Sequence, residues 1–201
     1  MTQVLLASRN PKKLAEMQRI LAPLVPDLQV LGLDDVAVYA EPRETEPTFE
    51  GNALIKARAA LAATGLPSLA DDSGLCVDAL NGMPGVLSAR WSGVEKDDRR
   101  NNELLLAQLR DVPDKRRAAQ FRCSVAFCAL DAAPAVRAGV MRGRVIRKMR
   151  GGGGFGYDGL FVPDGYDVTT AEMDPDLKDE LSHRGKALRA IAPVVAKALA
   201  G

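Results

Sequence analysis

The sequence is poor in the residues that build disulfide frameworks and metal–sulfur sites. Its 201 residues include three cysteines and one histidine. An odd number of cysteines argues against a disulfide framework, and the single His183 argues against a Cys/His zinc site. Cys123 and Cys128 lie in one predicted strand at a spacing that places them on opposite faces. Any metal is therefore expected to be a hard cation held by carboxylates.

The chain also lacks a large net charge of either sign and a long apolar run. Lys and Arg number 27 and Asp and Glu number 26, so no long-range field attracts nucleic acid or an anionic membrane. No run approaches the roughly 18 apolar residues of a membrane span, and residues 1–13 do not resemble a signal peptide. We expect a cytoplasmic protein that binds neither nucleic acid nor membrane and that meets small anions with local clusters of cations.

Strand-like and helical segments alternate early in the chain, and two long strands follow each other later. Strands are expected over 3–8, 28–33, 68–71, 74–80, 117–130 and 135–146, and helices over 11–24, 49–64, 97–109 and 182–200. Asn10, Thr48 and Ser182 are the expected N-caps. Leu14, Met17, Leu21 and Leu24 form an apolar stripe, as do Leu188, Ile191, Val195 and Leu199. The mixture predicts an α/β fold with a mixed central β-sheet flanked by helices, in a single domain over 1–201.

The segment ASRNPKKLAEM (7–17) places polar residues between a strand and a helix. Free backbone N–H groups and the positive end of the helix dipole predict an anion site there, next to Lys12 and Lys13. It is not a Walker A loop, because that glycine–lysine pattern is absent. The alternative is an ordinary capped helix with solvated lysines.

An acidic pair, Asp71 and Asp72, lies inside the apolar segment SLADDSGLCVDAL (68–80). A strand that ends in Asp-Asp-Ser-Gly places carboxylates at the rim of a sheet, where open α/β sheets bind ligands. Adjacent side chains on a strand point in opposite directions, so the two acids can have different roles. The alternative is a turn in which an aspartate caps local N–H groups and Gly74 supplies unusual torsions.

Three other segments combine polar and aromatic residues in patterns that suit a ligand. On the helix over 49–64, Thr48, Asn52 and Lys56 follow one another at i, i+4 and i+8. In GGGGFGYDGLF (151–161), Phe155, Tyr157 and Asp158 suit a planar base, although a mobile loop with one buried aromatic anchor is the alternative. In LKDELSHRGKAL (177–188), His183 and Arg184 begin the last helix, and a lone histidine there is commonly structural.

Six motifs together, in order, resemble the inosine triphosphate pyrophosphatase family: ASRNPKK, TFEGNALIKA, ADDSGL, GMPGVLSARW, GGFGYD and SHRGKAL. The resemblance implies hydrolysis of nucleoside triphosphates between the α and β phosphates, with a preference for ITP, dITP and XTP. It implies Mg²⁺ as cofactor, a small-molecule nucleotide as substrate and a homodimer. The expected architecture has two lobes with the active-site cleft between them.

The resemblance also implies roles for individual residues. Asp72 would be the general base and a metal partner, and Glu44 or Glu41 would be the second metal ligand. The substrate-binding residues would be Ser8, Arg9, Asn10, Pro11, Lys12, Lys13, Asn52, Lys56, Ser73, Phe155, Gly156, Tyr157, Asp158, Lys178, His183 and Arg184. Asp71 would support the turn or the water shell of the metal.

The chain departs from the family pattern at three positions. Arg9 stands where glycine is common, Gly51 stands where an acidic residue often precedes the asparagine, and Gly159 stands where proline commonly follows FGYD. Two alternatives to a pyrophosphatase therefore stay open. One is a nucleotide-binding sensor without catalysis, and the other is a hydrolase in which Asp71 or Asp72 becomes phosphorylated.

Overall fold

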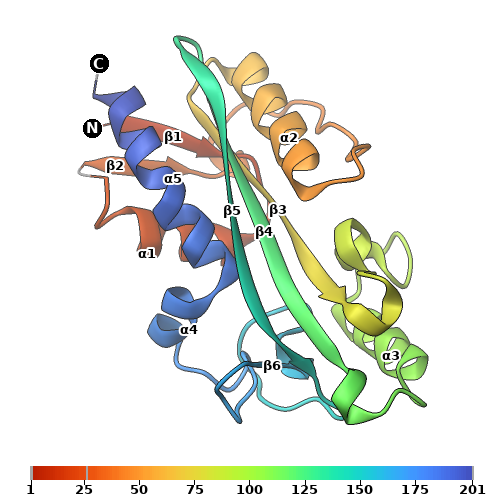
Figure 1. The fold of residues 1–201 in the computed structure, drawn as a ribbon. Coiled ribbons are helices and arrows are strands. Elements are labelled where there is room, and N and C mark those ends of the chain that lie inside the picture. The colour runs from red at the N-terminus through yellow and green to blue at the C-terminus, as the bar shows by residue number, and fades with distance from the viewer. Residues whose placement is uncertain (1, 26, 201) are drawn as a thin grey trace. The chain divides into compact units, whose positions relative to one another are not determined.

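The computed structural model describes residues 2–25 and 27–200, which form one mixed β-sheet with helices (Figure 1). The strand order is β2-β1-β3-β4-β5-β6. β1 pairs in parallel with β2 and β3, whereas β5 and β6 are antiparallel, so the predicted mixed sheet is confirmed. The strands are β1 Thr2–Leu6, β2 Leu28–Leu31, β3 Ser68–Val77, β4 Ala118–Ala129, β5 Ala132–Val145 and β6 Phe161–Pro163.

The helices begin where the sequence supplies caps. Asn10 Oδ1 accepts hydrogen bonds from the N–H groups of Lys12 and Lys13, and the Thr48 hydroxyl accepts one from Gly51 N–H. Both caps confirm the sequence prediction. The α-helices are α1 Pro11–Leu21, α2 Phe49–Thr64, α3 Asp98–Gln108, α4 Pro175–Leu181 and α5 His183–Leu199, and short 3₁₀ helices cover Leu33–Asp35, Asp78–Leu80, Gly85–Arg90, Asp114–Arg116 and Asp158–Leu160.

The chain divides into two compact units. Unit 1 comprises residues 1–72, 123–139 and 183–201, and unit 2 comprises 73–122 and 140–182. β3, β4 and β5 each contribute residues to both units. The predicted cleft between two lobes stays a prediction.

In unit 1, helices cover both faces of the sheet (Figure 1). α1 and α5 pack on one face through a large apolar cluster that includes Met17, Ile191 and Phe127. α2 packs on the other face, where its small side chains allow a close approach. Cys123 belongs to the first cluster and Cys128 to the second, as their spacing predicts.

In unit 2, α3 packs against the parts of β3, β4 and β5 that belong to this unit. The apolar cluster there combines residues of β3, α3, β4, β5 and β6, among them Leu75, Leu105, Phe121 and Phe161. The Phe121 and Phe161 rings lie 4.6 Å apart between centroids in a tilted arrangement, which is a favourable geometry for two aromatic rings.

Several sequence predictions are wrong in detail. β3 does not end at the acidic pair but continues from Ser68 to Val77, because nearby cations compensate the buried charge. Leu24 is 42% exposed, since it lies beyond the end of α1. The structure also contains α4, a short helix that was not predicted although its start, Asp174-Pro175, is a cap followed by a first-turn proline. Ser182 is the C-cap of α4 and directly precedes α5, so its predicted role as the N-cap of α5 stays a prediction.

The start of α5 lies directly on β5, and Gly139 makes that contact possible. A Cβ at Gly139 would lie 2.1 Å from His183 O and 2.8 Å from Ala187 N. Gly139→Ala is therefore expected to lower the free energy of unfolding by about 1–3 kcal/mol, the usual cost of overpacking. Denaturant titration measures the change.

The matched control is Gly152→Ala, because a Cβ at Gly152 would meet nothing within 4 Å. Equal stability of the two alanine variants would contradict the close contact between β5 and α5.

Candidate functional site

In unit 1, Asp71 belongs to a network of four charged side chains, together with Lys13, Arg184 and Glu16. Asp71 is 2% exposed and Arg184 is 2% exposed. Lys13 Nζ donates to the two Asp71 oxygens at 3.0 and 2.9 Å, and Arg184 donates to Asp71 Oδ2 through Nε and Nη2. Arg184 Nη1 also donates to Glu16. Two carboxylates and two cations cancel, which makes burial of the group tolerable.

The environment of Asp71 holds it in the ionised form. Burial by itself raises the pKa of Asp71, but the charges of Lys13, Arg184 and Lys56 outweigh burial and hold its pKa well below the usual range. The Cys123 thiol also lies 3.9 Å from Asp71 Oδ2, and burial raises its pKa above the ordinary value, followed by the charge of Asp71. Asp71 is therefore a fixed anion that joins α1, β3 and α5.

Asp72, the next residue, belongs to a different group of side chains. Asn52 Nδ2 donates to Asp72 Oδ2 at 3.2 Å, and Lys56 Nζ lies 3.5 Å from Asp72 Oδ1. Lys56 Nζ also pairs with Glu44 Oε1 at 2.9 Å. Alternation along β3 thus separates the two acids, as predicted from their adjacency.

The pKa of Asp72 shifts in the direction opposite to that of Asp71. Burial raises it first and the charge of Glu44 raises it further, while Lys56 and the hydrogen bond from Asn52 oppose the rise. A carboxylate with a raised pKa holds a proton more readily, which is the property of a general base near neutral pH.

The two candidate metal ligands, Glu41 and Glu44, have different partners. Glu41 pairs with Arg9, which also reaches Asp34 at 3.5 Å. Glu44 instead shares the Lys56 ammonium with Asp72. The arginine that replaces the common glycine thus fastens Glu41 to the start of α1, whereas Glu44 lies beside the candidate base.

Asn52 and Gly51 together fasten the loop that carries Glu44. Asn52 accepts a hydrogen bond from Glu46 N–H and donates one to Glu46 O. A Cβ at Gly51 would lie 2.6 Å from Glu46 Cβ. The glycine therefore lets this loop lie against α2, which runs through Gly51 from Phe49 to Thr64.

The start of α1 differs from the predicted anion site in one respect. The N–H groups of Lys12 and Lys13 both donate to Asn10 Oδ1, and Pro11 has no N–H. The prediction of free backbone N–H groups is therefore wrong, because the Asn10 cap already uses them. A bound anion would rely on side chains here, or would displace the cap.

In unit 2, Asp158 fastens the glycine-rich loop. Its Oδ2 accepts hydrogen bonds from Lys178 Nζ at 2.7 Å and Phe155 N–H at 2.8 Å, and its Oδ1 accepts one from the Thr170 hydroxyl. Lys178 Nζ lies 5.5 Å from the centre of the Phe155 ring. The structure therefore brings together Phe155, Asp158 and Lys178, three of the residues that the resemblance placed around the base.

The neighbouring residues of this loop are held by α3. Gly156 N–H donates to Asp98 at 2.7 Å, and Asn102 Nδ2 donates to Gly156 O at 2.8 Å. The Tyr157 hydroxyl donates to Ser88 O, and the ring is buried in the apolar cluster of unit 2. Tyr157 is thus a buried aromatic anchor, as expected if the segment were a mobile loop with one such anchor. Hydrogen bonds at Phe155, Gly156 and Asp158 also hold this loop, however.

For the other residues of the predicted site, the structure gives a position but does not test the predicted role. Ser8 accepts a hydrogen bond from Asn10 N–H, and Ser73 follows Asp72 on β3. His183 is buried at the first position of α5. The suggested contact of Arg184 with a purine base stays a prediction, and its guanidinium binds Asp71 and Glu16.

Sequence reasoning missed Glu16, Asp98 and Asn102. Glu16 is 5% exposed. It precedes Met17, a member of the predicted apolar stripe of α1, and this position next to the stripe was the only hint in the sequence that Glu16 is buried. Asp98 and Asn102 are spaced i and i+4 at the start of α3, so they share one face. The sequence shows this spacing, but no local pattern indicates that the two side chains would form hydrogen bonds with Gly156.

Across residues 2–25 and 27–200, no three His, Cys, Asp or Glu side chains gather as a metal cage. Within the same ranges, no helix has the length and apolar character needed to cross a bilayer.

The mixed sheet and the two clusters of side chains define an α/β protein with charge-rich candidate sites. The chain belongs to the Ham1 family, whose model matches residues 4–194, and the family resemblance is thereby confirmed. It is 60% identical to a dITP/XTP pyrophosphatase of Nocardia farcinica over 98% of this chain and 96% of that protein.

Solved structures agree with the fold. A HAM1 protein of Coxiella burnetii has a TM-score of 0.87 at 41% identity, over 98% of this chain and all (100%) of that chain. A nucleoside-triphosphatase / dITP/XTP pyrophosphatase of Mycobacterium abscessus has a TM-score of 0.77 at 52% identity, over 96% of this chain and 100% of that chain.

Removal of the Asp71 charge tests the buried network. Asp71→Asn leaves Lys13 without its counter-charge and Arg184 with Glu16 alone, so at neutral pH the free energy of unfolding should fall by about 3–5 kcal/mol. The matched control is Asp131→Asn in the exposed β4–β5 turn, for which no change beyond about 0.5 kcal/mol is expected.

The pH dependence follows from the lowered native pKa of Asp71. The stabilisation is fully present above the unfolded pKa, about 3.9, and is lost as the pH falls through the native pKa. Chemical denaturation between neutral and acidic pH should show a constant difference between wild type and variant that shrinks only below about pH 4. A difference that grows on acidification would contradict the assignment.

Proposed function

We propose that this protein hydrolyses nucleoside triphosphates that carry deaminated purines (ITP, dITP and XTP) to the monophosphate and pyrophosphate. Membership of the Ham1 family and the names of the curated relatives support this activity. The observation in the chain itself that carries it is the group in which Lys56 joins Asp72 to Glu44. Such an activity would remove deaminated purines from the nucleotide pool.

Asp72 is the proposed general base. Hydrolysis at the α phosphorus needs a water aligned opposite the leaving pyrophosphate and a group that takes its proton. The hydrogen bond from Asn52 and the charge of Lys56 fix the orientation of the Asp72 carboxylate. Asp71 is unsuited to this step because Lys13 and Arg184 stabilise its ionised form.

Local cations would bind the phosphates of the substrate. A nucleoside triphosphate carries about four negative charges, which is why a nearly neutral chain needs a dense local cluster. Lys12, Lys13 and Lys56 are the proposed cations, with Ser8, Arg9, Asn10 and Ser73 beside them. Because the Asn10 cap uses the N–H groups of α1, side chains would carry most of these contacts.

The residues beside Asp72 fit a magnesium ion. Asp72 and Glu44 offer oxygen ligands, the kind that Mg²⁺ prefers, and two carboxylates around one ammonium leave a negative excess. Magnesium commonly takes one or two carboxylates together with substrate phosphates, which agrees with the small number of acidic groups here. When bound, Mg²⁺ supplies positive charge that offsets the charge of the phosphates.

Lys178 is the residue that we propose to recognise the substituent at position 6 of the purine. Inosine and xanthine carry an oxo group at position 6, whereas adenine carries an amine. The Lys178 ammonium donates hydrogen bonds, so it would favour the oxo group and leave an amine unpaired, which is a strong basis for discrimination. Both Asp158 oxygens already accept hydrogen bonds from the protein, so Asp158 would orient Lys178. Rejection of GTP would depend on its 2-amino group.

We also propose a homodimer and a cytoplasmic location, both from the family resemblance. Sedimentation velocity of the purified chain tests the dimer, and a single species of about 21.5 kDa would contradict it.

Product analysis tests the activity and the base together. ITP with Mg²⁺ should yield IMP and pyrophosphate, and Asp72→Asn should lower kcat by about 10²–10⁴-fold while nucleotide binding persists. Asp131→Asn is the control with unchanged turnover. A panel of ITP, XTP, GTP and ATP reports base preference.

Orthophosphate as the first product would overturn the proposed bond position. Binding without cleavage would favour a sensor. In a single turnover in ¹⁸O-labelled water, the absence of ¹⁸O from both IMP and pyrophosphate would favour an aspartate nucleophile over direct attack by water.

The two glutamates give a matched test of the metal site. Glu44→Gln should raise the Mg²⁺ concentration needed for half-maximal turnover by about tenfold or more, because Glu44 lies with Lys56 and Asp72. Glu41→Gln should change that requirement little, since Glu41 pairs with Arg9. Magnesium titrations of both variants decide the assignment, and a larger effect of Glu41→Gln would reverse it.

A further inference from the structure

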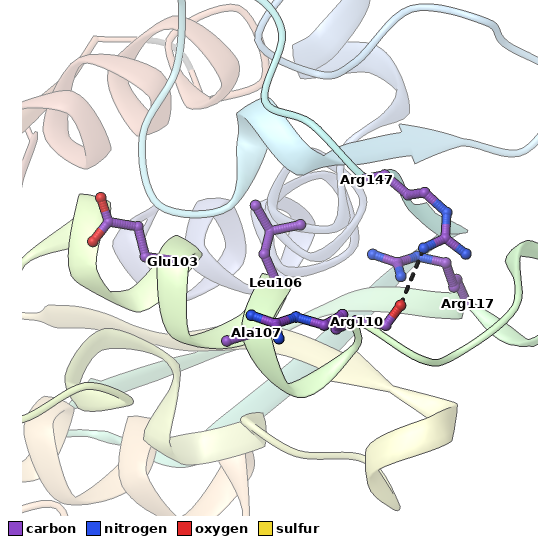
Figure 2. A pocket seen from close by; sticks show the side chains of 6 residues that line it. All are labelled: Glu103, Leu106, Ala107, Arg110, Arg117 and Arg147. Carbon is purple, nitrogen blue, oxygen red and sulfur yellow. Dashed lines mark hydrogen bonds between the residues drawn. The ribbon is translucent and has the colours of Figure 1, made fainter.

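A cavity of about 400 Å³ lies beside α3 in unit 2 (Figure 2). Its volume falls within the ordinary range for small-molecule sites. We call it the arginine pocket. It is lined by Glu103, Leu106, Ala107, Arg110, Arg117 and Arg147.

Arg117 is a fixed, buried cation in this pocket. It is 2% exposed, and its guanidinium donates to the backbone oxygens of Leu109, Val112, Val145 and Ile146. Within residues 2–25 and 27–200 it forms no salt bridge with a carboxylate. Burial and then the charge of Arg147 lower the pKa of Arg117. Buried charges are normally paired, but the carboxylate that acts on Arg117, Asp114, forms its salt bridge with Arg147.

Arg147 adds a second positive charge and has N–H groups that form no hydrogen bond with the described part of the chain. It donates to Asp114 at 2.7 Å, to Arg110 O at 3.2 Å and to Val112 O at 3.0 Å; Figure 2 draws the bond to Arg110 O. A guanidinium has five N–H groups, so these three bonds leave two donors unused. Its side chain is 51% exposed, which leaves room for a ligand.

Arg110 supplies the third guanidinium. Its side chain makes no ion pair or hydrogen bond with the part of the chain that the structure describes. The carboxylate in the lining, Glu103, lies 3.1 Å from Arg99. Backbone oxygens at the end of α3 carry about half a negative unit charge, and Asp114 compensates Arg147. More than one positive charge therefore remains at the pocket.

We propose that the arginine pocket binds a small molecule that carries a phosphate group. Arg110 and Arg147 contact the oxyanion above the fixed charge of Arg117, because guanidinium groups match phosphate oxygens in charge and in bidentate geometry. Leu106 and Ala107 form an apolar wall that contacts the organic part of the ligand. The lining of this pocket shares no residue with the proposed pyrophosphatase site, and the proposal does not rest on that activity.

Amide and arginine Nε resonances of the ¹⁵N-labelled chain locate binding directly. Inorganic phosphate should shift the amide signals of residues 106–112 and the Nε signals of Arg117 and Arg147. Phenyl phosphate should bind there more tightly than inorganic phosphate, because its ring contacts the apolar wall. Equal affinity for the two probes would overturn the role of the wall and point to free phosphate as the ligand.

Arg110→Gln is the decisive variant, because the Arg110 side chain makes no contact whose loss would unfold the protein. It should weaken phosphate binding at the pocket about tenfold, the loss expected for one charge-assisted hydrogen bond, with an unchanged Tm. Arg137→Gln, on the exposed side of β5, is the control with unchanged affinity. The proposal is overturned if the pocket signals do not move while those of α1 respond, or if Arg110→Gln binds as tightly as wild type.

Discussion

The rest of unit 1 depends on the ionised carboxylate of Asp71. It binds Lys13 of α1 and Arg184 of α5, which are 171 residues apart in the sequence, and Glu16 completes the balance of charge. Without these partners the two cations would be buried alone, at a cost of several kcal/mol. One strand residue therefore determines where two helices from opposite ends of the chain can lie.

That constraint explains why neighbouring acids have opposite properties. Because Asp71 is committed to the buried cations, Asp72 on the other side of β3 is left with a single shared ammonium and an amide. The pKa of Asp71 is lowered and that of Asp72 is raised. Pairs of acids whose environments separate their pKa values are the usual way in which a protein assigns one of them to proton transfer.

In unit 2, too, one carboxylate joins separate parts of the chain, but it has one charged partner and otherwise uncharged donors. A single carboxylate, Asp158, joins Lys178, the backbone of Phe155 and a threonine, and Asp98 and Asn102 hold both sides of Gly156. A loop so rich in glycine would otherwise sample many conformations, at an entropic cost to any ligand. These hydrogen bonds hold the backbone of Phe155 and Gly156 and the Lys178 side chain of α4 in place, and such preorganisation would favour the affinity of the proposed ligand.

Apart from β6 and α4, the sequence by itself indicated the strands and α-helices that the structure describes, and it also indicated the Asn10 and Thr48 caps and the family, because periodicity, capping and ordered motifs are local signals. It indicated that Asp71 and Asp72 could differ, since alternation is a property of any strand. Only the tertiary structure decided that β3 continues through the acidic pair, that Glu16 balances Arg184 and that Arg9 pairs with Glu41. Each of these outcomes depends on charges that meet across long separations in the sequence, and no local pattern specifies which charges will meet.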